Sequence, residues 1–479
     1  MNNNFKSKLL ALYRSWAGEE ATEIQELPES GSTRRYYRIT GHSRAAIGVF
    51  HNDSKENSAF ISFTKHFTKS GLPVPEIYAE SLSENIYLIK DLGDLTLFGY
   101  LSTVRKDDKG FPSVLTAIYR EIIEWLPLFQ IPAGKEIDYS LCYPRAAFDR
   151  QSMIWDLNYF KYYFLKLAKV PFDEQKLEDD FETLTDFLLE ANHNYFMYRD
   201  FQSRNIMLLD GKPYFIDYQG GRKGALQYDI ASLLFDAKAA IPQKIRNELL
   251  AFYLEVLENH LPFDKLKFLK YYYGFVLIRI LQAMGAYGFR GYYENKPHFL
   301  QSIPFAVQNI KWLLEGNNLT PHLPMLTAVL QEIIETTTFS HYPPDHSNLT
   351  VQISSFSYRN DIPRDESGNG GGFLFDCRAL PNPGKIEEYM EFSGKDQPVI
   401  EFLRKEHEVN DFLNHVFSLI DQSVKKYIDR GFKHLSVSFG CTGGKHRSVY
   451  CAEELARHLK SIFPVKIVIQ HNELNIESQ

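Results

Sequence analysis

The sequence predicts an α+β unit of two lobes followed by a small α/β domain. Short strand patterns follow a helix in the first 95 residues, and apolar spacing typical of helices fills most of residues 96–340. After a polar, Pro-rich stretch, strands and helices alternate to the end of the chain. We therefore expect a first lobe over 1–95, a helical second lobe over 96–340, a linker over 341–348 and an α/β domain over 349–479.

The composition is that of a globular protein with more than one domain. The chain has 479 residues, of which 44% are hydrophobic and 24% charged, and its formal net charge is −7. This charge gives no overall attraction to nucleic acid or anionic lipid, so a site for a polyanion must be local. The four cysteines lack metal-type spacing, which favours free thiols and a reducing compartment. The apolar run Leu9 to Trp16 is too short to span a membrane, and we expect a cytoplasmic protein.

The first lobe is predicted to contain an N-terminal helix and several short strands. Strand patterns occur at Arg35 to Ile39, Ala45 to Phe50 and Ile86 to Lys90. A helix over Ser58 to Lys69 is expected to end before Gly71. The lobe is therefore small and of mixed structure.

The second lobe is predicted to be mainly helical. Its helical spacing runs through 114–129, 154–167, 177–189 and 230–314. Two strands, 205–209 and 214–216, bracket Asp210-Gly211-Lys212, whose composition is typical of a hairpin turn.

The α/β domain is predicted to follow a linker that contains the polar, Pro-rich segment His341 to Asp345. Its predicted elements are strands at 349–355 and 373–376 with a Gly-rich loop at 368–372, helices over 399–428, a strand at 434–439 and a helix from His446. The alternation of strand and helix indicates an α/β fold.

The loop before the predicted hairpin has the spacing of a phosphoryl-transfer site. Such a site needs a carboxylate that orients the acceptor hydroxyl and a metal that neutralises phosphate oxygens. Asp200 is followed five positions later by Asn205, and Asp217 ends the next strand. This is the kinase-type arrangement D-x-x-x-x-N followed by a D-F-G-like turn. The alternative is that these residues only cap and turn the chain in a helical domain.

Over about residues 8–325 the chain resembles the aminoglycoside phosphotransferase-like kinases. Within them it is similar to the branch of anomeric N-acetylmuramate/N-acetylglucosamine kinases. The segments that carry this resemblance are Ser32 to Arg38, Leu72 to Pro75, Lys90 to Asp94, Arg199 to Phe201 with Asn205, Ile216 to Gln219, and Gln227 to Leu234.

The resemblance implies a bilobal protein-kinase-like fold with ATP in the cleft. It also implies that Asp200 is the catalytic base, that Asn205 and Asp217 hold Mg²⁺, and that Asp229 braces the catalytic loop. The nucleotide-binding residues that it implies are Ser32, Thr33, Arg34, Arg35 and Asp91.

One departure concerns the strand Ala45 to Phe50, which lacks the phosphate-pairing lysine of protein kinases. Arg34, Arg35 or Lys55 could supply that charge, and backbone N–H groups near Gly31 could hold phosphate. A pseudokinase that binds nucleotide without transfer is the alternative.

A second anion-binding pattern occurs in the α/β domain. A strand leads into the Gly-rich turn 440–448, which carries three basic residues at 445–447 and opens a helix. Aligned N–H donors and positive charge favour a phosphate. The spacing of Cys441 and Arg447 also matches C-x-x-x-x-x-R of thiol phosphatases. A plain strand-to-helix turn around a buried cysteine is the third interpretation.

Over about residues 350–470 the chain resembles the C-terminal domain of the RapZ RNase adapter, through Phe375 to Pro383, Ser393 to Asp396 and the turn 440–448. The resemblance implies a sensor of an amino-sugar phosphate of the glucosamine-6-phosphate type. Its expected site residues are Asp376, Arg378, Cys441, Thr442, Gly443, Gly444, Lys445, His446, Arg447 and Ser448. Asp376 and Arg378 can equally form a structural ion pair.

Two departures argue against RNA as a partner. The P-loop half of the adapter is replaced by the kinase-like domain, and the chain lacks the basic tail of RNA-binding members. Residues 349–479 carry 16 Lys and Arg against 18 Asp and Glu, so the net positive charge on which phosphate-backbone affinity depends is missing.

The two halves together lead to the hypothesis of an ATP- and Mg²⁺-dependent kinase for an N-acetylated amino sugar, acting at the anomeric hydroxyl in cell-wall sugar salvage. One alternative is a regulatory adapter whose kinase-like half only binds nucleotide and whose C-terminal half recruits RNA or protein. Another is a kinase for a different small alcohol or amine. Candidate acceptor residues are Asp156, Asn158, Asp236 and Arg290.

Overall fold

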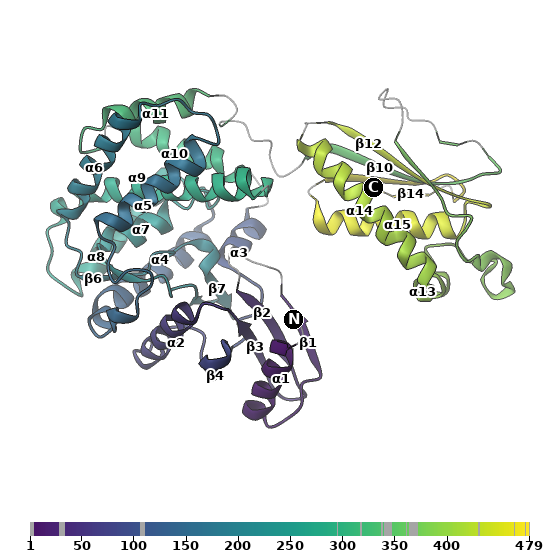
Figure 1. The fold of residues 1–479 in the computed structure, drawn as a ribbon, viewed down its shortest axis with the longest axis horizontal. Helices are drawn as coiled ribbons and strands as arrows, with labels where there is room; N and C mark the ends of the chain where they lie inside the picture. The colour runs from purple at the N-terminus through teal and green to yellow at the C-terminus, as the bar shows by residue number, and fades with distance from the viewer. Residues whose placement is uncertain are drawn as a thin grey trace. The chain divides into compact units, whose positions relative to one another are not determined.

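The computed structural model divides into two compact units, Met1–Tyr342 and Pro343–Gln479, which are described separately (Figure 1). The described residues are 4–27, 34–105, 111–294, 296–316, 319–336, 339, 347–360, 362–363, 372–429, 432–463, 465–474 and 476–478. Within these ranges no helix is both long and apolar enough to cross a membrane.

The first unit begins with helix α1 (Asn4–Ala17) and a five-stranded antiparallel sheet. The strands are β1 (Glu23–Glu26), β2 (Arg35–Thr40), β3 (Ala45–Phe50), β4 (Ile77–Ser81) and β5 (Ile86–Ile89), in the spatial order β1-β2-β3-β5-β4. The three predicted strands are confirmed as β2, β3 and β5.

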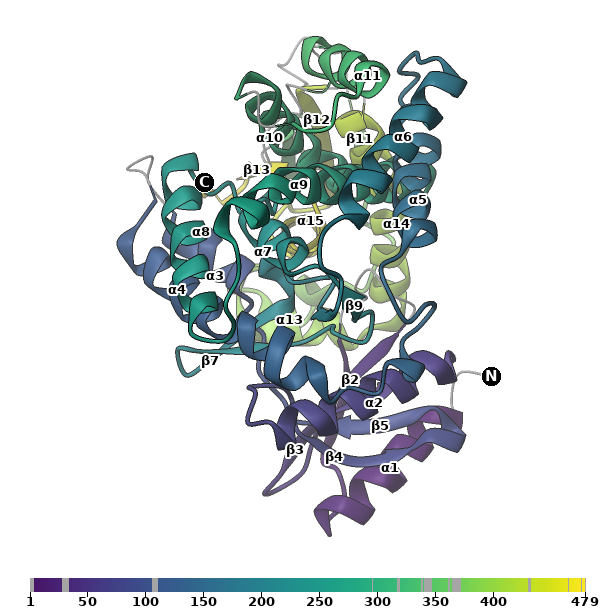
Figure 2. The ribbon, with the colours of Figure 1, turned by 90° about the vertical axis from the view of Figure 1, so that its left-hand side faces the viewer.

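Both faces of this sheet are covered (Figure 2). Successive side chains of a strand point to opposite faces. Accordingly Ile86 and Leu88 of β5 join the cluster formed with α1, whereas Tyr87 and Ile89 join the main core together with helix α2 (Ser54–Lys69). This explains why β5 is apolar at every position.

Helix α2 starts four residues before the predicted Ser58 because Asp53 caps it. The carboxylate of Asp53 accepts the backbone N–H groups of Lys55 and Glu56 at 3.0 and 3.1 Å. The cap places Glu56 in the first turn of α2.

The second lobe is helical, as predicted. Its α-helices are α3 (Leu97–Val104), α4 (Ser113–Leu128), α5 (Arg150–Phe160), α6 (Glu174–Leu189), α7 (Leu226–Leu234), α8 (Gln243–Glu258), α9 (Lys265–Gly288), α10 (Ile303–Glu315) and α11 (Pro324–Glu335). Helix α9 runs through the middle of the lobe and contacts α5, α6, α7 and α10. A Cβ on Gly288 of α9 would lie 2.0 Å from the carbonyl oxygen of Tyr163, so glycine permits this close approach.

Two short strand pairs flank residues 198–205, the loop that contains Asp200. Strand β6 (Tyr195–Met197) pairs with β9 (Arg222–Gly224), and β7 (Ile206–Leu209) pairs with β8 (Lys212–Phe215). The β7–β8 hairpin confirms the prediction, and its two turn residues, Asp210 and Gly211, have φ of 52° and 76°.

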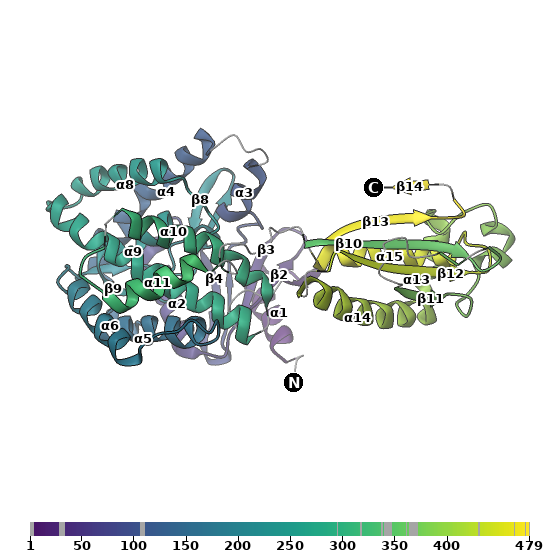
Figure 3. The same cartoon turned by 90° about the horizontal axis from the view of Figure 1, so that it is seen from above.

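In its described residues, the second unit is a mostly parallel sheet with three α-helices (Figure 3). Its strands are β10 (Ser347–Ser357), β11 (Phe373–Asp376), β12 (His434–Cys441), β13 (Val465–His471) and β14 (Ile476–Ser478). Their order is β11-β12-β10-β13-β14, and only the β13–β14 pairing among these described strands is antiparallel. The helices are α13 (Gln397–Lys405), α14 (His407–Asp429) and α15 (Arg447–Ile462). Residues 368–371 of the predicted Gly-rich loop lie outside the described residues.

The predicted fold class is therefore confirmed: an α+β bilobal unit is followed by a small α/β unit. In the second unit the carboxyl ends of β11 and β12 meet at one edge of the sheet and bring Asp376 near Cys441. Ligands commonly bind at this edge of a parallel sheet.

Candidate functional site

The loop between β6 and β7 is anchored by hydrogen bonds to Asp229 of α7. Its carboxylate accepts the backbone N–H groups of Tyr198 and Arg199 at 2.9 and 3.0 Å, and the side-chain amide of Gln130 at 3.1 Å. Burial raises the pKa of Asp229 to about 7, against the opposing effect of these hydrogen bonds. Asp229 thus braces the loop, which is the role that the resemblance implies.

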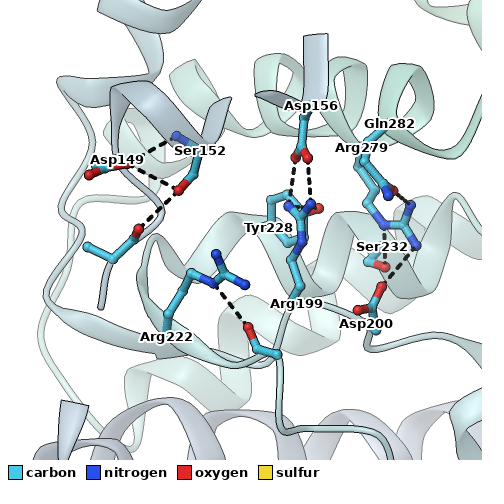
Figure 4. A network of polar contacts seen from close by, with 12 residues as sticks. Asp149, Ser152, Asp156, Arg199, Asp200, Arg222, Tyr228, Ser232, Arg279 and Gln282 are labelled. Atoms are coloured by element: carbon cyan, nitrogen blue, oxygen red, sulfur yellow. Dashed lines mark hydrogen bonds and ion pairs between the residues drawn. The ribbon is translucent and has the colours of Figure 1, made fainter. Parts of the chain in front are cut away.

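Arg199 adopts a strained backbone conformation directly before Asp200, with φ of 82°. Its guanidinium donates to both oxygens of Asp156 at 2.6 and 2.7 Å and to the hydroxyl of Tyr228 at 2.7 Å (Figure 4). These contacts and the Asp229 brace hold the loop so that the side chain of Asp200 remains 38% exposed.

Asn205 and Asp217 lie next to each other and to the start of the loop. The amide nitrogen of Asn205 donates to the carboxylate of Asp217 at 3.1 Å and to the carbonyl of Asp200 at 2.9 Å. The hydroxyl of Tyr198 donates to the carbonyl of Ile216 at 2.6 Å, which fixes the residue before Asp217. The structure therefore brings together the three residues that the motif singles out.

The oxygen donors of this site fit a hard cation such as Mg²⁺. Burial, followed by the negative charge of Asp200, raises the pKa of Asp217, so a bound cation would relieve an unfavourable concentration of negative charge. Carboxylate and amide oxygens are ligands that Mg²⁺ accepts, and substrate phosphates usually complete its shell. Asn205 and Asp217 would hold the ion.

A chain of polar contacts links Asp217 to Arg34, the residue before β2. Gln219 donates to Asp217 at 2.7 Å and to Glu56 of α2 at 3.2 Å. Glu56 also accepts from the guanidinium of Arg34 at 2.9 Å, and the Arg34 side chain is only 2% exposed. The buried guanidinium of Arg34, paired with the carboxylate of Glu56, therefore lies on the Asp217 side of the first lobe.

The other expected nucleotide-binding residues are placed differently. Arg35 pairs with Glu26 of β1 at 2.6 Å. Asp91 accepts from Arg38 at 2.6 and 3.1 Å and from the N–H of Gly93 at 2.9 Å, so it connects the segment after β5 to β2. Ser32 and Thr33, together with Gly31, lie outside the described residues, and Lys55 is exposed.

The candidate acceptor residues make contacts of their own. Asp156 pairs with Arg199, as described above. Asp236 accepts the backbone N–H of Ser203 at 3.1 Å and thereby supports the loop that contains Asp200. Arg290 pairs with Glu294 at 3.0 Å within one helical turn, and the side-chain oxygen of Asn158 is buried without a hydrogen-bond partner among the described residues.

One residue that the motif does not include lies beside Asp200: Arg279 of α9 approaches its carboxylate to 4.0 Å. No local pattern identifies Arg279, because α9 lies far from the motif in the sequence. Arg222 of β9 follows Asp217 by five residues and is only 8% exposed. Gln219, by contrast, stands two residues after Asp217 and belongs to a segment that the resemblance already includes.

In the second unit the Gly-rich turn folds around the thiol of Cys441. The sulfur is contacted by the N–H of Gly444 and the hydroxyl of Ser448, each at 3.2 Å. Burial disfavours the thiolate, but the hydrogen bonds from Ser448, Gly444 and Gly443 outweigh burial and lower the pKa of Cys441. A Cβ on Gly443 would meet no atom within 4 Å, so the turn is open at this position.

The basic side chains of the turn donate to neighbouring loops. Arg447 is 4% exposed and donates to the carbonyls of Arg378 and Leu380 at 2.8 and 2.9 Å. The ammonium of Lys445 reaches the carbonyls of Met390 and Glu391 at 3.0 and 3.1 Å.

Thr442 lies 3.4 Å from Arg447, and the ring of His446 contacts the Tyr389 carbonyl at 3.1 Å. Asp376 and Arg378 form an exposed ion pair of 2.7 Å. The expected residues therefore gather around one turn.

Comparison with known proteins agrees with this architecture. The first unit has the protein-kinase-like fold of phosphotransferases, with two lobes and the Asp200 loop in the helical lobe. Residues 23–265 match the model of the phosphotransferase enzyme family, which is just over half of the 479 residues. The chain belongs to that family. Residues 349–475 match the model of the RapZ C-terminal domain.

Curated relatives share only part of the chain. A nucleotide-binding protein of Fervidobacterium nodosum is 36% identical over 166 residues, which make up 34% of this chain and 53% of that protein. A nucleotide-binding protein of Staphylococcus epidermidis is 30% identical over 187 residues, or 36% of this chain and 60% of that protein. The chain spans about half the length of the curated relatives that it matches.

Among solved structures, similar chains include two choline kinases. The enzyme LicA from Streptococcus pneumoniae has a TM-score of 0.42 at 13% identity, covering 64% of this chain and 100% of its own. The enzyme from Cryptosporidium parvum has a TM-score of 0.45 at 13% identity, covering 68% of this chain and 99% of its own.

Proposed function

We propose that the chain is a cytoplasmic ATP-dependent sugar kinase that phosphorylates the anomeric hydroxyl of an N-acetylated amino sugar in cell-wall sugar salvage. The observation that carries the kinase part is that Asp200 and Asn205, on the loop braced by Asp229, converge with Asp217, which follows β8. The resemblance of both halves to proteins of amino-sugar metabolism supports the choice of acceptor.

In this mechanism Asp200 orients the acceptor hydroxyl and accepts its proton. The hydroxyl oxygen then attacks the γ-phosphorus of ATP, and the bond to the bridging oxygen breaks to release ADP. Asn205 and Asp217 would hold Mg²⁺, which would supply charge neutralisation at the phosphate oxygens. Gln219 orients Asp217, since its amide donates to that carboxylate at 2.7 Å.

Arg34 fills the role of the missing strand lysine in this proposal. In protein kinases the lysine on the third strand pairs with a helix glutamate and contacts phosphates. Here the buried Arg34 pairs with Glu56 of α2, and its charge acts on Asp217 to lower the pKa of that carboxyl, against the dominant effect of burial. Arg35, which pairs with Glu26, is assigned no phosphate contact.

The function is tested by ADP release from ATP and Mg²⁺ with N-acetylglucosamine, N-acetylmuramate, glucosamine, a hexose and an aminoglycoside as acceptors. Turnover restricted to N-acetylated amino sugars is the expected result. Asp200→Ala should lower kcat by about 10²- to 10⁴-fold while ATP binding is retained. Full activity of that variant would exclude Asp200 as the base.

For the second unit, the proposed ligand is an amino-sugar phosphate at the turn around Cys441. Support comes from the open position at Gly443 and from the backbone N–H groups at the start of α15, which can bind an anion. Calorimetry with glucosamine 6-phosphate, with glucosamine as the control, tests this assignment. Equal affinity for both compounds, or no binding of either compound, would contradict it.

The alternative is a regulatory adapter whose kinase-like half only binds nucleotide. It is favoured by the curated relatives, which are named nucleotide-binding proteins. ATP binding without turnover on any acceptor of the panel would select this alternative.

A further inference from the structure

The guanidinium of Arg279, on α9, is buried and faces the exposed carboxylate of Asp200 (Figure 4). The Arg279 side chain is 10% exposed and the Asp200 side chain 38% exposed. Among the described residues, Asp200 supplies the only carboxylate within 4.0 Å of this guanidinium. Arg199, by contrast, is paired with Asp156 through two hydrogen bonds. A buried charge is stabilised by an opposite charge, and Asp200 is the group placed to provide it for Arg279.

Three hydrogen bonds to uncharged side chains hold the guanidinium of Arg279 in one orientation. Its Nε donates to Ser232 of α7 at 2.9 Å, and its Nη1 donates to Gln282 of α9 at 2.5 Å. Its Nη2 donates to Gln202, in the loop that contains Asp200, at 3.2 Å. The group is therefore anchored on three sides and needs little reorganisation to bind a ligand.

One N–H of Arg279 remains for a ligand. Nη2 carries two N–H bonds, and Gln202 is its hydrogen-bond acceptor among the described residues. The same Nη2 is the atom that lies 4.0 Å from Oδ1 of Asp200. This distance is too long for a direct hydrogen bond, so the second N–H is not used by the carboxylate.

The space between the two groups suits a hydroxyl oxygen. One oxygen can lie about 2.8 Å from both Nη2 and the carboxylate oxygen, because two hydrogen bonds of this length together exceed the distance between those atoms. Such an oxygen must donate a hydrogen bond to Asp200 and accept one from Arg279. A hydroxyl group can do both, whereas a protonated amine can only donate.

We propose that Arg279 is a catalytic residue that holds the reacting hydroxyl oxygen of the acceptor together with Asp200. This inference rests on the proposed kinase function and adds a second contact at the reacting oxygen. The hydroxyl has two lone pairs: Arg279 binds one, and the other attacks the γ-phosphorus of ATP. The new O–P bond forms, the proton passes to Asp200, and the bond from the γ-phosphorus to the bridging oxygen breaks to release ADP. Arg279 thereby fixes the direction of attack.

Arg279→Gln tests this role, because it removes the charge and the free N–H. We expect kcat/KM for N-acetylglucosamine to fall by about 10- to 100-fold, while KM for ATP stays within about threefold of the wild-type value. The fall should be similar for every acceptor that the wild-type protein uses, since the reacting hydroxyl is common to them. Arg279→Lys, which keeps the charge and some N–H donors, should retain more activity than Arg279→Gln.

Arg246→Gln is the matched control for loss of a buried arginine. Arg246 of α8 is 7% exposed, and its guanidinium contacts the side chain of Gln243 and the ring of Phe235. This variant should have a lower melting temperature but the wild-type kcat/KM for the acceptor. An equal fall of kcat/KM in both variants would attribute the effect to a general loss of structure and overturn the inference.

Chemical rescue separates a catalytic role from a structural one. Arg279→Ala leaves a space that added guanidinium ion can fill, at concentrations that do not unfold the wild-type protein. Guanidinium should restore part of kcat, whereas urea, which is planar and of similar size but uncharged, should not. Equal restoration by both compounds, or by neither, would assign Arg279 a structural role only.

Failure of this inference can be told from failure of the kinase function. Turnover by Arg279→Gln at the wild-type kcat/KM would overturn the role of Arg279 and leave the kinase function intact. If no sugar is phosphorylated, slow ATP hydrolysis gives the same comparison, because water is then the reacting oxygen. Hydrolysis should fall by about tenfold or more in Arg279→Gln, and an unchanged rate would reject the role. Absence of both transfer and hydrolysis would reject the proposed kinase function and this role with it.

Discussion

Arg34 and Arg35 are adjacent in the sequence but have different surroundings. The Arg34 side chain is 2% exposed and paired with Glu56, whereas Arg35 and its partner Glu26 are 28% and 38% exposed. The sequence alone left the substitute for the kinase lysine open between these two arginines and Lys55. The ion pair between Arg34 and Glu56 of α2 distinguishes Arg34 from the other two candidates. The sequence does not show this pair, because only the tertiary fold brings Glu56 next to Arg34.

Glu56→Gln tests the buried pair. The glutamine retains the shape of the side chain but leaves the Arg34 charge unbalanced, so we expect a loss of about 1–3 kcal/mol in the free energy of unfolding and a higher KM for ATP. Urea denaturation and steady-state kinetics measure the two effects. Glu26→Gln is the matched control, since exposed pairs contribute only about 0–1 kcal/mol. Equal behaviour of the two variants would contradict the assignment of Arg34.

Asp229 gives a prediction for the pH dependence of stability. Its pKa in the folded protein is about 7, above the value of about 3.9 for an unfolded aspartate. The group therefore favours the folded state below about pH 4, and this contribution is lost as the pH rises through about 7.

The stability of the wild-type protein relative to Asp229→Asn should thus fall between pH 5 and pH 8. Chemical denaturation of both proteins at several pH values measures the difference. A difference that does not change with pH would show that burial does not raise this pKa.

At the scale of elements, segments that bury apolar residues in a regular pattern were the most predictable. The helices α4 and α6 and the strand β3 match their predicted ranges closely for this reason. Strand β11 also matches its predicted range, although none of its four residues is buried. Strands β6 and β9 have three residues each, too few for a pattern to emerge. The start of α2 carried a signal that was missed, since Asp53 and Glu56 have the spacing of a capping box.

The cap of α2 should matter for nucleotide binding as well as for stability. Asp53→Ala removes a side chain that accepts two backbone N–H groups and should cost about 0.5–2 kcal/mol of stability. Because Glu56 follows in the first turn, KM for ATP should rise too. Asp264→Ala removes an equivalent cap from α9, at Leu266 and Lys267, and serves as the control. It should lower the melting temperature similarly while KM for ATP stays constant; a rise in both variants would point to a general loss of structure.

The convergence of the kinase-type motif was predictable for a related reason. Asp200, Asn205 and Asp217 lie within 18 residues of each other on one strand–loop–hairpin segment, so their spacing alone predicts that they meet. Arg279 could not be found in this way, because the packing of α9 brings it to Asp200.

For the whole molecule, the fold class was predictable because composition and periodicity change along the chain. Each unit has its own core: residues 349–469 supply the buried cluster of the second unit, and the two clusters of the first unit contain none of them. Separate cores should unfold as separate cooperative transitions.

Calorimetry should therefore show two unfolding transitions. A non-hydrolysable ATP analogue with Mg²⁺ should raise the midpoint of one transition only, because a ligand stabilises the unit that binds it. Val437→Ala, in a fully buried position of β12, should lower the midpoint of the other transition. A single transition shifted by both changes would show that the units unfold together.

The most direct test of the account is phosphorus NMR of the products formed from ATP, Mg²⁺ and N-acetylmuramate. We predict a sugar phosphate signal coupled to the anomeric proton, formed by the wild-type protein and lost in Asp200→Ala. ATP that binds but remains intact, or a phosphate attached to a different hydroxyl, would contradict the central claim of an anomeric amino-sugar kinase.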